Sequence, residues 1–515
     1  MNASHEHSLS VWGRHAEVAD AAPLGADAEA DLVVVGAGLA GLSIAYELAR
    51  EGRSVIVLDR GPIGGGMTAR TTGHLSSDLD DYYHEMIRVR GLDQAAQVFR
   101  AHAAAVDRVE QVSREEGIAC DFKRLDGYLY AAPGGDLDDL GRELEACHQV
   151  GFAGVTFAER APVPGLDTGP CLRFPDQGRF HPLKYLNGLA AAIRRRGGRL
   201  CAGTAVTEVE EQGDEVLVRT EAGHTVRARA CAVASNSPIN DRIAIHTKQA
   251  PYRSYVIAGR VPRGSVPDAL TYDTLDPYHY VRLQEADEGQ DWLIVGGEDH
   301  RNGEADDQEQ RLDRLEAWTR ERYPSLGQVE RRWSGMVYEP VDFAAYIGRN
   351  HGNRHVYVAT GDSGQGMTNS VAAGLIVRDL VMGRQNAFAE VHDPTRISPS
   401  VVGEFVKDNL EVAGNLTEYV TRGDVGSLDE IRAGSGAVVR QGLAKVAAYR
   451  DEEGELHLRS AVCTHAGCIV HWNDFEKCWD CPCHGSHFAP NGSVLQGPAV
   501  SPLARVDAPE EAAGA

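Results

Sequence analysis

The sequence predicts an α/β protein built on a parallel sheet, with an antiparallel sheet inserted into it and a small all-β domain near its end. From about residue 31 to 384, short apolar runs alternate with helical patterns, as in parallel-sheet proteins. Between 247 and 297 the runs take the alternating character of antiparallel strands. From 424 onward, short strands and turn residues dominate. A chain of 515 residues also exceeds the usual size of one domain.

These patterns divide the chain into four parts. We expect an N-terminal arm (1–30), an α/β region (31–385) whose inserted subdomain includes about 247–345, a linker with one helix (386–423), and a small β domain (424–510).

The composition is strongly acidic. Lys and Arg number 51 against 75 Asp and Glu, which leaves a formal net charge of −24. Such a surface disfavours nucleic acid and anionic membranes as partners. The first thirty residues hold no apolar core typical of a secretory signal, and the longest apolar stretch, Leu32 to Tyr46, is interrupted by three glycines. We therefore expect a cytoplasmic protein with no membrane span and no nucleic-acid partner.

A glycine fingerprint directly follows the first apolar run and opens a helix. It reads Gly36-Ala37-Gly38-Leu39-Ala40-Gly41. The first glycine permits a tight turn, the second lets backbone approach a pyrophosphate, and the third lets helix and strand pack closely. The helix N-terminus adds unpaired N–H groups for phosphates. The alternative, glycines that serve only a tight turn, is disfavoured by the complete strand-turn-helix-strand context.

Two further segments extend this cofactor site. The second strand ends in Asp59, 23 residues after Gly36, where a carboxylate can accept hydrogen bonds from both ribose hydroxyls; Arg60 follows it. A second glycine-rich turn lies at 359–368, after a strand and before a helix, where its N–H groups can reach another part of the same cofactor. Its candidate cofactor-binding residues are Gly361, Asp362, Gly364, Gly366, Met367 and Thr368.

NAD and FAD share the fingerprint, but no second copy occurs, so a separate nicotinamide domain is not expected. With these segments at its ends, region 31–384 resembles the glycine/D-amino-acid oxidase (DAO) family of flavoproteins. The resemblance implies FAD, oxidation of a carbon attached to nitrogen, and a strand near Val206 that holds the adenine side. Some members of the family bind their flavin covalently through a cysteine or histidine, but no such residue is singled out here, so we expect noncovalent FAD. The predicted fold class is then an α/β FAD-binding Rossmann-like domain with an inserted antiparallel-sheet substrate subdomain.

Candidate catalytic residues come from two places. The loop from Gly64 to Leu75 is expected to run along the cofactor, with Thr71 and Thr72 beside it. His74 on this loop can face the flavin, although a structural loop histidine is the alternative.

The inserted sheet supplies the other candidates, Tyr255, His279 and Arg282, with Arg253 and Tyr280 as neighbours. An arginine there can pair with a substrate carboxylate, and tyrosines can wall an amine pocket. Half-buried strand residues without substrate contact are the alternative.

A cysteine and histidine cluster near the C-terminal end is the most specific motif. Cys463-Thr464-His465 and Cys481-Pro482-Cys483-His484 form two boxes that match the Rieske type of [2Fe–2S] centre. Thiolates from Cys463 and Cys481 would hold one iron, and imidazoles from His465 and His484 the other. A tetrahedral zinc site is the competing interpretation, which the paired boxes disfavour. The small all-β domain is therefore expected to be a Rieske domain.

The second cysteine of each box, Cys468 and Cys483, has a counterpart in the Rieske subunits of cytochrome bc complexes. The resemblance to those subunits implies a Cys468–Cys483 disulfide, which is unusual in the cytoplasm. It also implies that Ser486 donates a hydrogen bond to a bridging sulfide. Those subunits carry a tyrosine where this chain has Phe488. Because a hydrogen bond to a ligand sulfur is then lost, we expect a lower reduction potential.

Together these motifs predict a flavin-dependent dehydrogenase for a small amine or amino acid. Electrons would pass from FAD to the [2Fe–2S] cluster and on to an external one-electron acceptor, a protein or a quinone. If the acidic balance persists around the cluster, the acceptor should be neutral or basic. One alternative is an oxidase that uses O₂ and keeps the cluster as a structural element. A second is an electron-transfer or redox-sensing protein without a substrate of its own.

Overall fold

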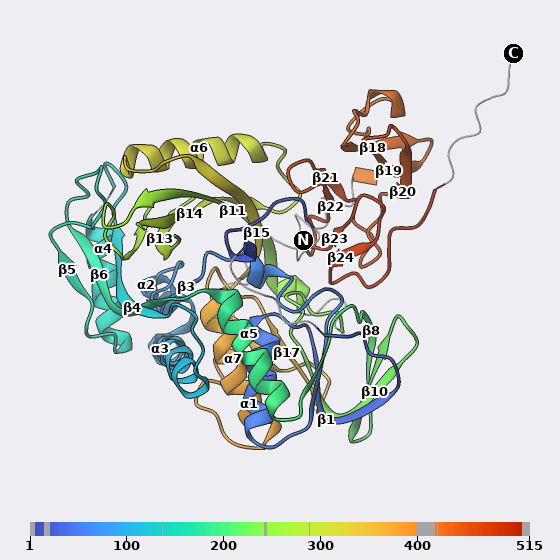
Figure 1. Ribbon diagram of the computed structural model, residues 1–515, viewed down its shortest axis with the longest axis horizontal. Coiled ribbons are helices and arrows are strands. Elements are labelled where there is room, and N and C mark those ends of the chain that lie inside the picture. Colours follow the sequence, from blue (N-terminus) through green and yellow to red (C-terminus); the bar gives the residue numbers. More distant parts are fainter. Residues whose placement is uncertain are drawn as a thin grey trace, which may run out of the picture.

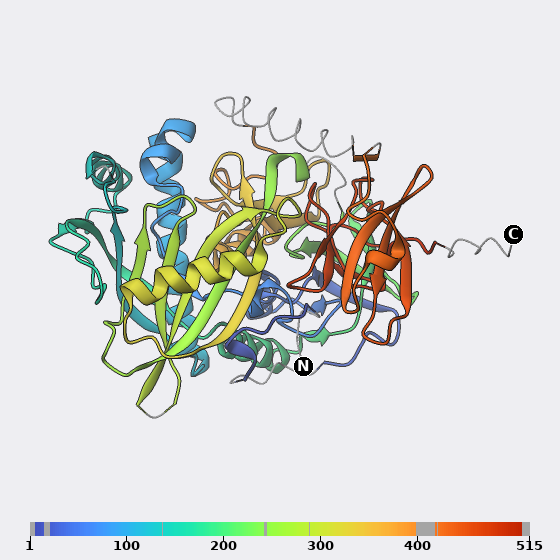
Figure 2. The ribbon, with the colours of Figure 1, turned by 90° about the horizontal axis from the view of Figure 1, so that it is seen from above.

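The computed structural model describes residues 6–14, 21–135, 137–240, 245–287, 289–397, 418–419 and 421–506. Two large sheets form the main body, and a smaller C-terminal body, coloured orange to red, lies against one side of it (Figures 1 and 2). Among the described residues, no helix combines the length and apolar character needed to cross a bilayer.

The first sheet carries the glycine fingerprint at the end of β1 (Ala28–Val35). Its strand order is β16-β17-β10-β1-β2-β7, and the strands from β17 to β7 are parallel. All four residues of β2 are buried, as expected for a strand covered on both faces, which explains the continuous apolar run. The other strands are β2 (Val55–Leu58), β7 (Arg199–Cys201), β10 (Thr225–Val233), β16 (Tyr346–Arg349), β17 (Val356–Thr360) and the added pair β8 (Val206–Gln212) and β9 (Glu215–Thr220).

Helices cover one face of this sheet. α1 (Leu39–Arg50) packs against α5 (Pro182–Arg195) and α7 (Gly366–Val381), and α3 (Leu92–Glu116) packs against α7 in turn. The main apolar core lies between these helices and the sheet. The N-termini of α1 and α7 both follow glycine-rich turns. The two predicted cofactor segments therefore sit on neighbouring helices.

The second sheet is larger than expected. It contains strands from Lys123–Arg179 as well as the predicted segment, because β12 pairs with β4 in parallel. Its order is β15-β11-β14-β13-β12-β4-β6-β3, and β5 pairs with β6. α6 (Gln308–Arg322) packs on β11 and β14. The strands are β3 (His74–Leu75), β4 (Lys123–Tyr130), β5 (Thr156–Ala158), β6 (Cys171–Arg179), β11 (Gln249–Pro262), β12 (Leu270–Asp273), β13 (His279–Glu285), β14 (Gln290–Arg301) and β15 (Val329–Pro340), with α2 (Tyr83–Arg90) and α4 (Leu137–Val150) beside them.

The C-terminal body holds two small antiparallel sheets. The first predicted cluster box lies between β20 and β21, and the second lies between β22 and β23. Their apolar core includes the ligand cysteines. The strands are β18 (Ser435–Gln441), β19 (Ala444–Arg450), β20 (Leu456–Ser460), β21 (His471–Asn473), β22 (Cys478–Asp480), β23 (His487–Phe488) and β24 (Val494–Gln496).

The described part of the N-terminal segment is an integral part of the fold and not a loose arm. Trp12 is 1% exposed, and its indole N–H donates to the carbonyl oxygen of Thr71 at 2.6 Å. β1 begins at Ala28, three residues before the expected start of the α/β region. Of the linker 386–423, in which we expect one helix, residues 398–417 and 420 lie outside the described part of the chain, so the helix stays a prediction.

Candidate functional site

The glycine fingerprint forms the turn between β1 and α1 at close packing distance. A Cβ at Gly36 would lie 2.3 Å from the carbonyl oxygen of Ala234, and one at Gly41 would lie 1.9 Å from that of Gly36. Gly38 caps α1 without a side chain, and the first turn holds no acidic residue. The positive end of the helix is therefore free to face an anion.

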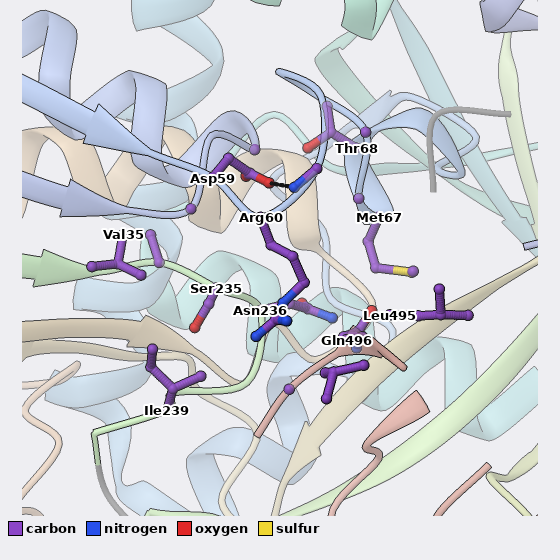
Figure 3. A pocket seen from close by; sticks show the side chains of 18 of the residues that line it. Val35, Asp59, Arg60, Met67, Thr68, Ser235, Asn236, Ile239, Leu495 and Gln496 are labelled. Atoms are coloured by element: carbon purple, nitrogen blue, oxygen red, sulfur yellow. Dashed lines mark hydrogen bonds between the residues drawn. The ribbon is translucent and has the colours of Figure 1, made fainter. Parts of the chain in front are cut away.

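A cavity of about 500 Å³ opens at this turn (Figure 3). Asp59 lies at its edge and accepts hydrogen bonds from the backbone N–H groups of Ala37 (2.6 Å) and Gly61 (2.7 Å). Burial raises the pKa of Asp59. Ala37 and Gly41, the other two residues of the fingerprint, do not line this cavity. The predicted residues that line the cavity are Gly36, Gly38, Leu39, Ala40, Asp59, Arg60 and Val206.

A second cavity, of about 140 Å³, shares Met67, Thr68 and Ser370 with the first. It lies between the second glycine-rich turn and the large sheet. Gly364 has a φ of +70°, which favours glycine. Gly361 lies outside the wall and packs against Gln249 and Pro340. The predicted residues that line this cavity are Thr71, Thr72, His74, Asp362, Gly364, Gly366, Met367 and Thr368.

The two cavities fit a dinucleotide with a flanking ring system. The N-terminus of α1, where Thr68 Oγ1 accepts only the N–H of Leu39 among side-chain contacts of the described residues, faces the first cavity and suits the pyrophosphate, and Asp59 stands at the edge where a ribose would lie. Val206, expected on the adenine side, lines the first cavity, and the second glycine-rich turn borders the second cavity. The residues present can hold FAD.

His74 is the one candidate catalytic residue that lines the second cavity. Its Nδ1 lies 2.9 Å from the hydroxyl of Thr72. Its ring touches those of Tyr272 and Tyr280, with centroids 5.8 Å and 5.5 Å away. Burial, and then the charge of Arg282, lowers the pKa of His74 to about 3. The imidazole is therefore neutral at physiological pH.

Tyr255, His279 and Arg282 do not line the cavity, contrary to expectation. Tyr255 and His279 point to the opposite face of the sheet, where Tyr255 shares a 3.0 Å hydrogen bond with His300. His279 stacks on Trp318 at 4.3 Å. Arg282 is fully buried and donates to the backbone oxygens of Gly73 and Phe180.

Arg253 also serves a different purpose from the predicted substrate contact. It is 1% exposed, and its Nη2 donates to both carboxylate oxygens of Asp480, at 3.0 and 2.9 Å. Its Nη1 donates to Ser334 Oγ at 2.8 Å. Asp480 belongs to the C-terminal body, so this pair joins the two bodies.

A second buried arginine strengthens the same interface. Arg70 pairs with Glu6 at 3.0 Å and with Glu476 of the C-terminal body. Glu476 also accepts hydrogen bonds from the hydroxyls of Ser8 and Ser334, each at 2.6 Å. The N-terminal segment, the large sheet and the C-terminal body thus meet in one charged network.

The residues of the second cavity that the sequence did not indicate are mainly polar. They come from the loop after β3, from β11 and β12, and from the position just before β13, where neighbours of the predicted residues face the cavity. When both faces of a strand are buried, its composition does not show which of its residues face a cavity. Gly296 is one sequence feature that fits this arrangement, because the ring of Tyr280 occupies the space that a Cβ at residue 296 would need. These residues are Asp80, Ser254, Tyr272 and Tyr278; Tyr280, a neighbour of the predicted candidates, and Asp299 line the cavity as well.

The two cluster boxes converge as a ligand set. The rings of His465 and His484 lie 4.9 Å apart at 89°. Cys463 and Cys481 are close enough for their thiols to interact. Among the described residues, Nδ1 of His484 is buried without a hydrogen-bond partner, and burial lowers the pKa of His484 to about 3. A neutral imidazole with an available nitrogen beside paired thiols fits a Rieske-type cluster.

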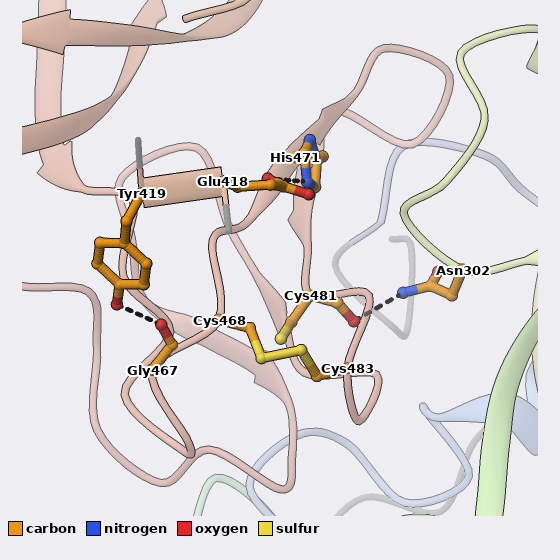
Figure 4. Close-up of a disulfide and its surroundings, with 8 residues drawn as sticks. All are labelled: Asn302, Glu418, Tyr419, Gly467, Cys468, His471, Cys481 and Cys483. Carbon is orange, nitrogen blue, oxygen red and sulfur yellow. Dashed lines mark hydrogen bonds and ion pairs between the residues drawn. A yellow bond between two sulfur atoms is a disulfide. The ribbon is translucent and has the colours of Figure 1, made fainter. Parts of the chain in front are cut away.

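The expected Cys468–Cys483 disulfide is present beside these ligands (Figure 4). The sulfur atoms of Cys468, Cys481 and Cys483 lie within 4.8 Å of one another. Ser486 is fully buried and is placed to hydrogen-bond Cys463. Phe488 is fully buried in the same apolar core as the ligand cysteines. Cys478 is a free, buried thiol.

The second cluster box packs against residues of the main body, one of which lines the second cavity. A Cβ at Gly485 would lie 2.5 Å from Tyr338 Oη and 2.8 Å from Met336 Sδ. Tyr338 Oη donates to the carbonyl oxygen of His484 at 3.2 Å, and Met336 lines the second cavity. On the C-terminal side, His487 and Gln496 line the first cavity. One layer of side chains separates the cluster box from the second cavity.

The cluster histidines also face the main body. The ring of His246 lies 5.0 Å from that of His465 and 5.6 Å from that of His484. Asn302 Nδ2 donates to the carbonyl oxygen of Cys481 at 3.3 Å. The sequence offered no signal for these contacts, because they join residues about 180 or more positions apart.

Comparison with known protein families assigns both parts of the chain. Residues 31–380 match the model of the DAO family, described as FAD dependent oxidoreductase. Residues 421–507 match the Rieske [2Fe-2S] domain.

Relatives show both the complete architecture and the main body alone. A Bacillus subtilis protein, YhfW, named as a Rieske 2Fe-2S iron-sulfur protein, is 30% identical over 503 residues, 97% of each chain. The Escherichia coli gamma-glutamylputrescine oxidoreductase is 26% identical and matches 75% of this chain and 92% of its own length. The crystal structure of glycine oxidase from Geobacillus kaustophilus matches 72% of this chain and 99% of its own with a TM-score of 0.61 and 20% identity, which shows a shared fold.

Proposed function

The chain belongs to the DAO family of FAD-dependent oxidoreductases and carries a C-terminal Rieske [2Fe–2S] domain, and from this we propose that it is a dehydrogenase whose electrons leave through the Rieske domain. The proposed substrate is a small amine or amino acid. The names of the similar enzymes, which act on amines and amino acids, support this class.

One observation carries the proposal. The second cluster box, at Gly485, packs directly on Met336 and Tyr338 of β15, and Met336 lines the second cavity, where the flavin ring and the substrate would meet. This contact brings the cluster box within one layer of side chains of the second cavity, and such a short separation is what electron transfer between the two cofactors requires. Bound FAD would supply two-electron oxidation of a C–N bond, and the cluster would supply one-electron transfer.

The chain's own residues have definite tasks in this scheme. The N-terminus of α1 and the carboxylate of Asp59 hold the dinucleotide. Neutral His74 and the tyrosines of the second cavity exclude water and shape the reacting end of the substrate. Cys463, His465, Cys481 and His484 hold the cluster, and Tyr338 and Asn302 fix the backbone of its second box.

Anaerobic mixing of the holoenzyme with a panel of amines and amino acids tests the proposal. We expect a panel member to bleach the flavin, followed by the electron paramagnetic resonance signal of the reduced cluster. In Cys463→Ser, which removes a ligand, the flavin should still bleach while reduction of an added one-electron acceptor is lost.

Two results would contradict the proposal. Hydrogen peroxide formed at the substrate turnover rate and unchanged in Cys463→Ser would indicate an oxidase with a structural cluster. Failure of every amine and amino acid to bleach the flavin, with full reduction by a partner protein, would indicate an electron-transfer protein. The external acceptor, a neutral or basic protein or a quinone, and the cytoplasmic location stay predictions, which acceptor assays and cell fractionation test.

A further inference from the structure

The second cavity is acidic. Asp80, Asp299 and Asp362 line it, each from a different element. Arg70 is the one cationic residue that lines it among the described residues, and its guanidinium is paired with Glu6 and Glu476. The cavity therefore holds an excess of carboxylates over cations.

Two carboxylates of this cavity, Asp80 and Asp299, lie within electrostatic range of each other. Asp80 accepts a hydrogen bond from Tyr278 Oη at 2.7 Å and lies against the backbone of Gly364. Burial, and in addition the negative charge of Asp80, raises the pKa of Asp299 to about 7. Both groups would be stabilised in their ionised form by a cation between them.

Independent polar atoms point to a ligand with hydrogen-bond donors. Gln365 is 7% exposed and lines the cavity, yet its Oε1 has no donor among the described residues. Asp299 Oδ1 is likewise a buried atom without a donor in the described structure. A buried acceptor without a donor is costly, so these atoms call for an N–H group. An alkylammonium offers three such donors.

Among the described residues, neither of the two arginines that the sequence offered for a substrate carboxylate is available in this cavity. Arg253 is paired with Asp480 and Arg282 with backbone oxygens, and neither lines the cavity among the described residues. A carboxylate placed beside Asp80 and Asp299 would meet like charges in a partly desolvated space.

We propose that the substrate is an amine with a second, positively charged amino group and no carboxylate on the oxidised carbon, held through that ammonium by Asp80, Asp299 and Gln365. The inference rests on the proposed function and narrows its substrate class. Tyr278 and Tyr280, with ring centroids 5.6 Å apart, flank the same region and favour a cation over an anion.

Matched pairs of compounds test the inference on the holoenzyme. Each pair differs by one carboxylate: 1,3-diaminopropane and 2,4-diaminobutanoate, 1,4-diaminobutane and ornithine, 1,5-diaminopentane and lysine. Isothermal calorimetry measures binding, and anaerobic bleaching measures flavin reduction. We expect one diamine to bind and to bleach the flavin at least tenfold better than its carboxylated partner, and better than butylamine, which lacks the second ammonium.

Asp299→Asn and Asp80→Asn test the assigned residues. Each should weaken diamine binding at least tenfold and leave butylamine binding within about twofold. Glu298→Gln is the matched control, since Glu298 is the neighbour of Asp299 on β14 but pairs with Arg314 at 2.8 Å. At pH 8, where Asp299 is mostly ionised in both proteins, it should bind diamines like the unaltered protein.

The outcomes separate this inference from the proposed function. If an amino acid binds and bleaches the flavin better than its diamine, the inference is overturned and the proposed function stands. If diamines bind with the expected dependence on Asp80 and Asp299 but nothing bleaches the flavin, the proposed function fails while the site assignment holds. If no diamine binds, or if binding is unchanged in both Asp variants, the assignment is wrong.

Discussion

Arg253 shows how strongly the surroundings of one side chain decide its role. Its place on a strand of the substrate sheet suggested a substrate contact, but the guanidinium is buried and pairs with Asp480. Asp299, on the neighbouring strand β14, keeps a buried oxygen without a donor. Both side chains are ionisable, yet the one is fully paired inside the protein and the other keeps an oxygen available to a ligand.

At Phe488 we expect a substitution to change the cluster potential. Phe488→Tyr should raise the midpoint, because a phenolic O–H that donates to a ligand sulfur stabilises the reduced, more negative cluster. A net hydrogen bond of about 1 kcal/mol corresponds to about 40 mV for a one-electron couple. Redox titration followed by electron paramagnetic resonance measures it. Phe475→Tyr, whose ring packs in a different core, should leave the midpoint unchanged; an unchanged midpoint in Phe488→Tyr would refute the prediction.

The buried carboxylates predict how diamine binding depends on pH. Burial raises the pKa of Asp80 to about 6 and that of Asp299 to about 7; the charges of Asp80 and Glu298 also raise the latter, while Ser254 and Arg311 lower it. Below these values the carboxyl groups are protonated and hold a cation poorly. Above them they are ionised, while the alkylammonium stays charged to about pH 10.

The dissociation constant of a bound diamine should therefore fall as pH rises from 5 to 8, by up to about tenfold per pH unit below the pKa. Calorimetry in buffers of different ionisation enthalpy should also detect proton release on binding near pH 6 to 7. Asp299→Asn should flatten the profile, and a flat profile in the unaltered protein would contradict the assignment.

At the scale of elements, the face of the strand on which a residue lies decides whether its side chain lines the second cavity. On β13, Tyr280 faces the cavity while its neighbour His279 stacks on Trp318 of α6. On β11, Ser254 and Val256 line the cavity while Tyr255 lies in the core behind it. Because α6 covers the far face, aromatic residues are found on both sides. Composition therefore could not reveal which face held the site.

The turn from β1 to α1 gives an element-scale prediction. Gly41→Ala should release most of the bound flavin and lower the free energy of unfolding by about 1–3 kcal/mol, because the new Cβ would lie 1.9 Å from the carbonyl oxygen of Gly36. The absorbance ratio of flavin to protein and thermal unfolding measure these effects. Gly141→Ala, in helix α4, is the control: its new Cβ meets nothing within 4 Å, so this variant should keep its bound flavin. Equal flavin content in the two variants would refute the prediction.

At the scale of the whole molecule, the Rieske domain is docked by buried charges and not by an apolar face alone. Arg70, Arg253, Glu6, Glu476 and Asp480 are each at most 3% exposed. Breaking such a pair is costly because one charge stays buried and unpaired. This charged network holds the second cluster box against β15 and so fixes the distance between the flavin site and the cluster site.

Arg253→Ala should therefore loosen the interface by about 3–5 kcal/mol. We expect faster hydrogen exchange in Glu476–Phe488, and slower cluster reduction after flavin reduction, at unchanged iron content. Arg332→Ala, on β15, removes a partly exposed guanidinium that pairs with Glu316 at 2.6 Å and should change stability by at most about 1 kcal/mol. Unchanged exchange and an unchanged cluster reduction rate in Arg253→Ala would show that the network does not control docking.

Contiguous motifs were readable in the chain alone. The fingerprint at Gly36–Gly41, the second glycine-rich turn and the two cluster boxes each lie within about ten residues, and their chemistry follows from local geometry and residue type. The family, both cofactors and the Cys468–Cys483 disulfide followed from them. The substrate side did not follow: three of four candidate catalytic residues lie outside the cavity.

Only the folded chain could assign partners to its buried polar groups. Whether Arg253 binds a substrate or Asp480, and whether Asp299 faces a cavity or the core, depends on groups more than 100 residues away in sequence. The cost of burying a charge is set by all of its neighbours in space, and sequence spacing does not specify them. The acidic cavity and the charged interface are therefore properties of the tertiary structure, while the two redox motifs are properties of the sequence.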